Sequence, residues 1–159
     1  MTTNTHCNDS RVAAIQDDLR EHPERARTTL RANSQKLEGA VANPDLAPAQ
    51  RVLDALAKCH AETYRLFAEA LGIPLTDIQV KLRGALDLRG IYAAADQIRP
   101  GFAGIEATVH LSSPADIYEV ERLRITVERH APVLDILRNP TPVKIELVIT
   151  HCENPPIAA

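Results

Sequence analysis

The sequence is poor in aromatic residues, which make up 3% of its 159 residues, and it contains no tryptophan. A surface that stacks nucleic-acid bases needs several aromatic side chains, so the composition disfavours such an interface. The net charge of -3 also excludes the broad positive field that non-specific nucleic-acid binding requires. We therefore expect no nucleic-acid partner.

Long apolar runs are missing as well. The chain has no run of the roughly 18 apolar residues that a membrane-spanning helix requires. The N-terminal segment MTTNTHCNDSRVAAIQDDLR lacks the apolar centre of a signal peptide. These features predict a cytoplasmic protein with no membrane partner.

Cysteine is scarce: Cys7, Cys59 and Cys152 are the three cysteines, an odd number at wide spacing. Such a set makes no disulfide framework, and in a reducing compartment the thiols are expected to be free. His6 and His151 precede two of the cysteines, but the paired short spacings of a zinc site do not occur. We expect neither a metal nor a cofactor.

The length suits one domain with a terminal arm. We divide the chain into an arm with a helix, a weak strand and a loop (residues 1–47), a core (48–150) and a short tail (151–159). Ser10 is the expected cap of the arm helix, and Gly39 the expected end of the weak strand.

The core begins with a long helix that starts at Pro48 and ends at Gly72. We expect one face of this helix to be buried, and a second side, formed by Leu53, Ala57 and Ala61, adds further apolar surface. Cys59 then lies near the middle of the helix and largely out of water. The residues of the first face are Val52, Leu56, Cys59, Thr63, Leu66, Phe67 and Ala70.

Period-two alternation follows in DIQVKLRGALDL and GIEATVHL, which predicts two antiparallel strands joined by a long excursion. Ser113 is the expected cap of the next helix, with Pro114 in its first turn. A short helix begins at Pro132, and PVKIELVIT is expected to form the last strand of the sheet.

Three stretches, LDALAKCHAETYRLFAEALGI, VKLRGALDLRGIYAAADQIRPGF and VERHAPVLDILRNPTPVKIEL, together resemble the OsmC/Ohr family of organic hydroperoxide resistance and osmotically induced proteins. The resemblance implies an α+β fold in which an antiparallel sheet packs on a long central helix. It also implies an intertwined homodimer with active sites at the subunit interface.

The same resemblance implies a peroxidatic cysteine after an ALxxC-like run, which is Cys59 here. The family's resolving cysteine opens the short helix, where this chain reads RHAPVLD and has Ala131. Without a resolving thiol, a sulfenic acid on Cys59 has to be reduced by an external thiol. Cys152 or Cys7 as a substitute resolving thiol remains an open alternative.

A second departure is the short connection between the weak strand and the central helix, which predicts a reduced N-terminal sheet region. The start of the short helix has no side chain that caps it, so its first amides are expected to lack side-chain partners. The family geometry implies that these amides face Cys59. His130 is the better candidate for a base, whereas His60 is expected on the surface or at an interface. The substrate pocket is expected to include Ala131, Val133, Leu134 and Phe102.

Two functions remain open from the sequence. The first is thiol-dependent reduction of a small organic hydroperoxide by Cys59. The alternative is a protein without peroxidase activity that uses the pocket of the dimer to bind a small hydrophobic ligand, or for catalysis without redox chemistry.

Overall fold

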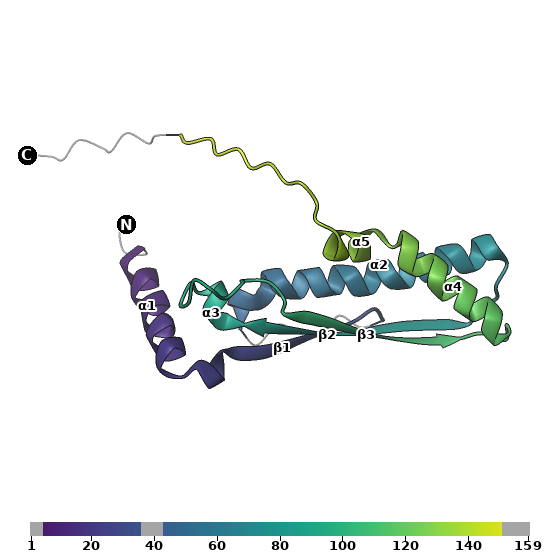
Figure 1. The fold of residues 1–159 in the computed structure, drawn as a ribbon, viewed down its shortest axis with the longest axis horizontal. Coiled ribbons are helices and arrows are strands. Elements are labelled where there is room, and N and C mark those ends of the chain that lie inside the picture. Colours follow the sequence, from purple (N-terminus) through teal and green to yellow (C-terminus); the bar gives the residue numbers. More distant parts are fainter. Residues whose placement is uncertain (1–4, 36–42, 151–159) are drawn as a thin grey trace, which may run out of the picture.

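A three-stranded antiparallel sheet and one long helix lying across it form the frame of the molecule (Figure 1). The computed structural model describes residues 5–35 and 43–150. The elements confirm the expected α+β class. In chain order they are α1 (Thr5–Glu21), a 3-10 turn η1 (Pro23–Ala26), β1 (Arg27–Asn33), a 3-10 turn η2 (Pro44–Leu46), α2 (Ala47–Leu71), β2 (Asp77–Asp87), α3 (Leu88–Ile91), β3 (Gly104–Ser112), α4 (Ile117–His130) and α5 (Pro132–Arg138).

The sheet has the order β1-β2-β3, with both pairs antiparallel. The central strand β2 confirms the expected alternation, because every second residue from Ile78 to Leu86 is buried and those between are exposed or half-buried. The excursion between the two predicted strands is also confirmed, and it contains α3. One face of the sheet packs on α2, and the polar face turns away from it.

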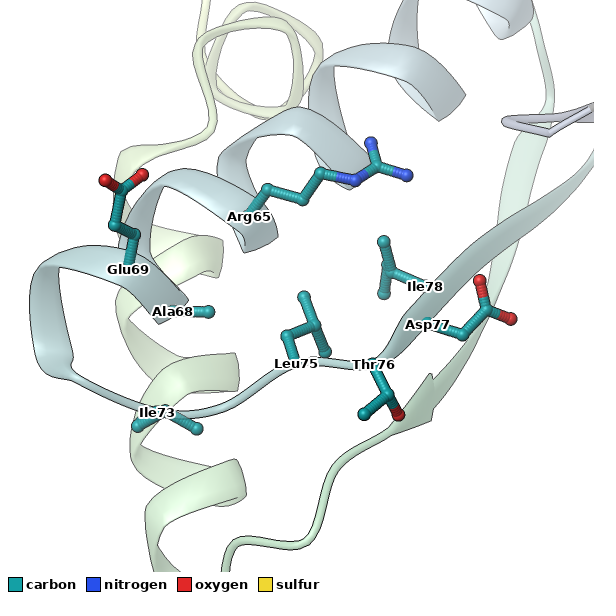
Figure 2. A pocket seen from close by; sticks show the side chains of 8 residues that line it. All are labelled: Arg65, Ala68, Glu69, Ile73, Leu75, Thr76, Asp77 and Ile78. Atoms are coloured by element: carbon teal, nitrogen blue, oxygen red, sulfur yellow. The ribbon is translucent and has the colours of Figure 1, made fainter.

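Helix α2 ends as expected at Gly72, which has a left-handed φ of 68° and whose N–H bonds the carbonyls of Ala68 and Glu69. The chain then runs back to β2 and leaves a hollow of about 290 Å³ beside the end of the helix (Figure 2). The hollow is lined by Arg65, Ala68, Glu69, Ile73, Leu75, Thr76, Asp77 and Ile78.

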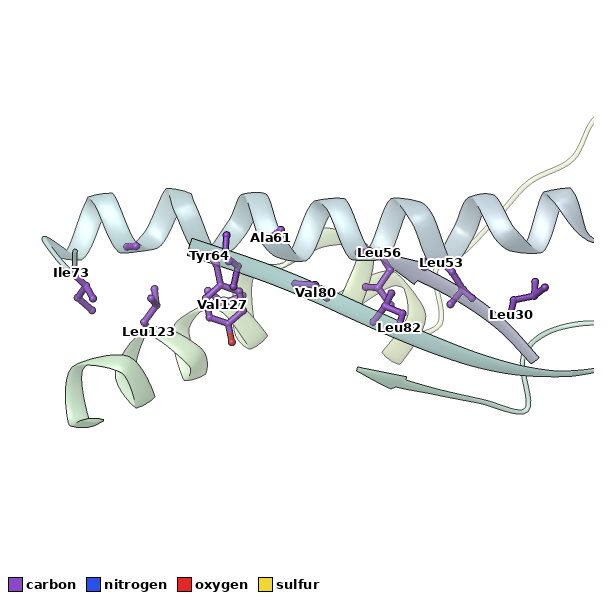
Figure 3. Packing of buried hydrophobic residues seen from close by; sticks show 14 of the residues in the cluster. Leu30, Leu53, Leu56, Ala61, Tyr64, Ile73, Val80, Leu82, Leu123 and Val127 are labelled. Atoms are coloured by element: carbon purple, nitrogen blue, oxygen red, sulfur yellow. The ribbon is translucent and has the colours of Figure 1, made fainter. Parts of the chain in front are cut away.

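The buried face of α2 differs from the expected one. Val52 is 38% exposed and Leu66 is 61% exposed, although both belong to the face that was expected to be buried. Leu56 and Thr63 of that face are buried as expected. The sheet and α4 cover the side that carries Leu53, Leu56, Ala61 and Tyr64 (Figure 3), and this side includes the second apolar surface that the sequence predicts. Ala57 and Ala68 belong to the same buried cluster. The alanines of this side let the helix lie close to the strands, which favours it over a side of bulkier residues.

The main core lies between α2, the sheet and α4. Leu53, Val80, Leu123 and Val127 have no exposed surface. They belong to one continuous cluster that also includes Leu30 of β1 and Leu82 of β2. Burial of this cluster therefore fixes α4 against α2 and positions α5 after it.

The N-terminal helix starts earlier than expected, because α1 already begins at Thr5 and Ser10 lies inside it. Arg11 of α1 pairs with Asp45 at 2.9 Å, and the Tyr92 hydroxyl donates to the same carboxylate at 2.6 Å. These bonds fasten α1 to the segment after α3, where Leu19 and Tyr92 share a second small core. Strand β1 ends at Asn33, and Gly39 lies outside the described residues.

The cap of α4 is Asp116 rather than Ser113. The Asp116 carboxylate accepts a hydrogen bond from the Glu119 N–H at 2.9 Å, so the helix begins at Ile117. Ser113 instead accepts from the N–H of Ala115 at 3.1 Å, which closes a turn before the helix.

The last expected strand does not form within the chain. Residues 140–150, which we call the C-terminal arm, run away from the sheet without a strand partner (Figure 1). Five of its apolar side chains are between 66% and 91% exposed: Val143, Ile145, Leu147, Val148 and Ile149. Pro140 and Pro142 have fixed φ angles and favour extended backbone in the residues before them.

No helix in the described ranges has the length and apolar character that crossing a membrane would demand.

Candidate functional site

Cys59 occupies the middle of α2 and is half-buried. It is therefore less enclosed than expected, because the side of α2 that carries it does not face the sheet. The hydroxyl of Thr63, one helical turn later, lies 4.0 Å from the sulfur and donates to the Cys59 carbonyl at 2.7 Å. The thiol thus has a hydroxyl beside it and a path to solvent.

Val52 and Leu66 lie seven positions before and after Cys59, so the three residues share one side of the helix. Both side chains are exposed. The sulfur therefore belongs to an apolar stripe on the outer side of α2, which we call the outer stripe.

His130, the expected base, is exposed at the end of α4. Its ring lies 5.3 Å from the ring of Phe67. Phe67 is eight positions beyond Cys59 in α2, about 12 Å along the helix axis. The role of His130 as a base stays a prediction.

Helix α5 begins at Pro132 without a side-chain cap, as expected. Ala131, which stands where the family has a resolving cysteine, is fully buried, and its N–H bonds the carbonyl of Val127 at 2.9 Å. Val133 and Leu134 are half-buried and pack against the main core. The orientation of its first amides toward Cys59 stays a prediction.

A larger cavity of about 880 Å³ lies between α2, β3, α4, α5 and the loop before β3. Phe102 and Leu134, two of the expected pocket residues, line it, whereas Cys59 is not among the lining residues. Its apolar walls are Leu56, Phe102, Ile105, Ala107, Val109, Leu134 and Leu137, and its polar lining consists of His60, Tyr64, Arg99, Arg124, Glu128 and Arg138 with the backbone of Gly101 and Gly104.

His60 lies in this cavity wall and not on the surface where it was expected. The side chain is 7% exposed, its ring meets the ring of Tyr64 edge-on at 5.5 Å, and its Nδ1 has no hydrogen-bond partner among the described residues. Burial lowers the pKa of His60 below its ordinary value, and Glu128 opposes part of this effect. Burial, helped by Glu128, raises the pKa of Tyr64 to about 12.

The lowered pKa of His60 predicts a loss of stability in mild acid. The unfolded chain takes up a proton at this residue near pH 6.5, whereas the folded chain does so only at lower pH. The free energy of unfolding should therefore decrease as the pH falls below that value, by less than about 1.4 kcal/mol per pH unit.

Urea unfolding between about pH 5 and pH 7.5 measures this effect. We expect His60→Phe to flatten the pH dependence relative to the wild type. His110→Gln, at an exposed position of β3, serves as the control and should leave the dependence unchanged. An equally steep dependence in His60→Phe would show that other groups cause the acid sensitivity.

Comparisons with known proteins agree with this arrangement. The family model of the OsmC-like proteins matches residues 42–146, which is more than half of the chain. The chain belongs to the OsmC-like protein family. The fold is similar to the crystal structure of an OsmC-like hydroperoxide resistance protein from Jannaschia sp. CCS1, with a TM-score of 0.54 and 22% identity over 72% of each chain. No curated protein sequence matches this family member.

Sequence reasoning missed most of the polar lining of the cavity. His60 and Tyr64 follow Leu56 at four-residue steps, so they were on one side of the helix by spacing alone. The spacing predicts that these residues share one side of the helix, but it does not predict that β3 and α5 enclose them. Arg99 and Glu128 are far apart in sequence, and only the packing of α4 and the excursion brings them to one cavity.

Proposed function

We propose that this OsmC-like protein reduces small organic hydroperoxides with Cys59 as its nucleophile and an external thiol as the reductant. The observation that carries the proposal is the position of this thiol at the midpoint of the central helix, half-buried and next to Thr63. A partly open thiol with a hydroxyl neighbour suits attack on a small peroxide.

The reaction uses one sulfur. The Cys59 thiolate attacks one peroxide oxygen, the O–O bond breaks, and the leaving alkoxide takes up a proton to become an alcohol. Cys59 is oxidised to a sulfenic acid. An external thiol then forms a mixed disulfide with release of water, and a second thiol restores Cys59 and leaves as the disulfide of the reductant.

Intact-mass measurement during peroxide titration tests this proposal. Without reductant we expect Cys59 to gain one oxygen atom and, with excess peroxide, further oxygen atoms, because Ala131 provides no sulfur to form a disulfide. With an added thiol the mass should return to that of the reduced protein after the first oxidation. Peptide mapping that places the oxygen on Cys7 or Cys152, or a loss of two hydrogens that marks an internal disulfide, would contradict a single-cysteine cycle.

The protein's proposed partner is a second copy of itself. The C-terminal arm exposes five apolar side chains and does not pair with its own sheet, while both sheet edges, β1 and β3, lack a further strand among the described residues. The outer stripe around Cys59 is a second exposed apolar surface. Reciprocal exchange of the arms in a symmetric dimer buries the arm, and pairing of the two outer stripes places each Cys59 beside the subunit interface.

Binding of a small hydrophobic ligand is the second candidate function. The observation that favours it is the 880 Å³ cavity, because its volume lies in the range of small-molecule sites and its lining does not include the thiol. Catalysis without redox chemistry would use the same cavity.

A further inference from the structure

The cavity beside His60 is built unlike a packed core. Its walls combine apolar side chains from β3, α2 and α5 with polar groups from α2, α4 and the loop before β3. Three of the polar groups are arginines and one is a glutamate, so the lining carries excess positive charge. A molecule with an apolar body and a negative group matches this distribution.

The arginines of the lining differ in how far their charge is already compensated. Arg124 pairs with Glu121 at 2.6 Å and also with Glu128, and Arg138 approaches Glu128 at 3.8 Å. Arg99 is exposed at the cavity edge, and its guanidinium makes no ion pair or hydrogen bond with any other described residue. Arg99 is therefore the cation that remains available for an anionic ligand.

The backbone around Arg99 is held close to α3. A Cβ atom added to Gly90 would lie 2.3 Å from the Arg99 carbonyl oxygen, so only glycine permits this contact. The loop thus rests directly on α3, and Phe102, three residues later, packs over Gly84 of β2. This packing fixes the backbone of Arg99 at the edge of the cavity.

His60 lies in the wall of the cavity and has a buried ring nitrogen without a partner. The side chain is more than nine-tenths buried and lines the cavity, yet its Nδ1 lacks a hydrogen-bond partner within residues 5–35 and 43–150. Buried polar atoms without partners are rare in native proteins because the lost hydrogen bonds to water are not replaced.

We propose that this cavity binds a small amphipathic carboxylate, with the carboxylate on Arg99 and the apolar body against Ile105, Val109 and Leu134. The guanidinium offers two parallel N–H groups that match the two carboxylate oxygens. From Leu56 to Tyr64 the α2 wall extends about 12 Å, which suits a medium-length acyl or arylalkyl chain. The inference deepens the second candidate function and does not depend on the chemistry of Cys59.

Calorimetric titration of the full-length protein with sodium octanoate and with 1-octanol tests the charge requirement. We expect octanoate to bind at least about tenfold more tightly than the alcohol, since only octanoate can form the charged hydrogen bonds. Arg99→Gln should reduce octanoate affinity to that of the alcohol. Arg122→Gln removes an exposed arginine of α4 outside the cavity and should leave the affinity unchanged.

A pair of variants on β3 tests the location. Ala107→Phe fills the cavity and should abolish binding of both compounds, whereas Thr108→Phe places the same ring on the outer face of the strand and should not. Circular dichroism establishes whether both variants are folded. If Ala107→Phe does not fold, the comparison of Arg99→Gln with Arg122→Gln decides the question.

Lack of octanoate binding to the full chain overturns the proposal. This holds also if binding fails because the C-terminal arm of a second copy fills the cavity. Equal losses in Arg99→Gln and Arg122→Gln overturn it as well. The same titration with Cys59→Ser separates the two functions, because octanoate binding should persist in that variant whether or not the wild type reduces peroxides.

Discussion

Replacement of Cys59 by serine is expected to lower thiol-dependent consumption of an alkyl hydroperoxide by at least about a thousandfold, to the rate without protein. A serine hydroxyl is almost entirely protonated at neutral pH and is a poor nucleophile toward peroxide oxygen. The rest of the site should persist, because Cys59 is half-buried and serine is of similar size. Peroxide consumption coupled to oxidation of an added dithiol measures the effect.

The other two thiols provide matched controls for this experiment. Cys7→Ser and Cys152→Ser should retain the wild-type rate, since a single-cysteine cycle uses neither sulfur. A large loss in Cys152→Ser would identify a resolving thiol in the C-terminal tail and would replace the external-reductant cycle with an internal disulfide. If Cys59→Ser keeps the wild-type rate, the proposed nucleophile is wrong, while membership of the OsmC-like family stands.

The neighbouring hydroxyl adds a smaller effect to this cycle. Thr63 donates to a backbone carbonyl of its own helix and lies 4.0 Å from the sulfur, so it contacts the thiol weakly. We therefore expect loss of the Thr63 hydroxyl to change the rate far less than loss of the proposed nucleophile.

The strands and the bounds of the central helix were predictable because local signals determine them. Alternation from Ile78 to Leu86 requires one buried face of β2, and Gly72 is the residue that adopts the left-handed φ at the end of α2. The start of α5 at Pro132 was predictable for the same kind of reason. The order of motifs then led to the family.

The orientation of α2 was not predictable from its own residues. Apolar side chains occur on most of its circumference, and the choice between sides depends on the sheet and α4, which are formed by distant segments. The same limit explains why His60 was expected on the surface and Cys59 in the interior. The role of Cys59 stays a prediction, and its position on α2 is more open than expected.

The missing last strand has a different cause. Val143, Ile145, Leu147 and Ile149 alternate with Lys144, Glu146, Val148 and Thr150, which is a strand pattern, yet the segment pairs with neither open edge of its own sheet, β1 or β3. Sequence periodicity therefore indicates the conformation that the segment favours and does not say which strand, if any, it pairs with. This difference is the strongest physical argument for the proposed dimer.

The double variant Ile145→Asp with Leu147→Asp is accordingly expected to convert the dimer into monomers. The two side chains are 91% and 79% exposed in the single chain and point to one side of an extended arm, so both would be buried against a second copy. Loss of each buried side chain lowers the free energy of dimer dissociation by about 1.5–3 kcal/mol. Burial of the new carboxylates adds a further cost. Size-exclusion chromatography with light scattering measures the change in mass.

Lys144→Ser with Glu146→Ser alters the alternate side of the same arm and should leave the dimer intact, because these side chains would remain in water. The two double variants therefore separate a specific apolar interface from a general effect of changing the arm. A wild type that is monomeric at micromolar concentration would remove the proposed exchange of arms. In that case the outer stripe of α2, with Cys59 between Val52 and Leu66, is left open to solvent, and peroxide would reach the thiol from water without passing through a subunit interface.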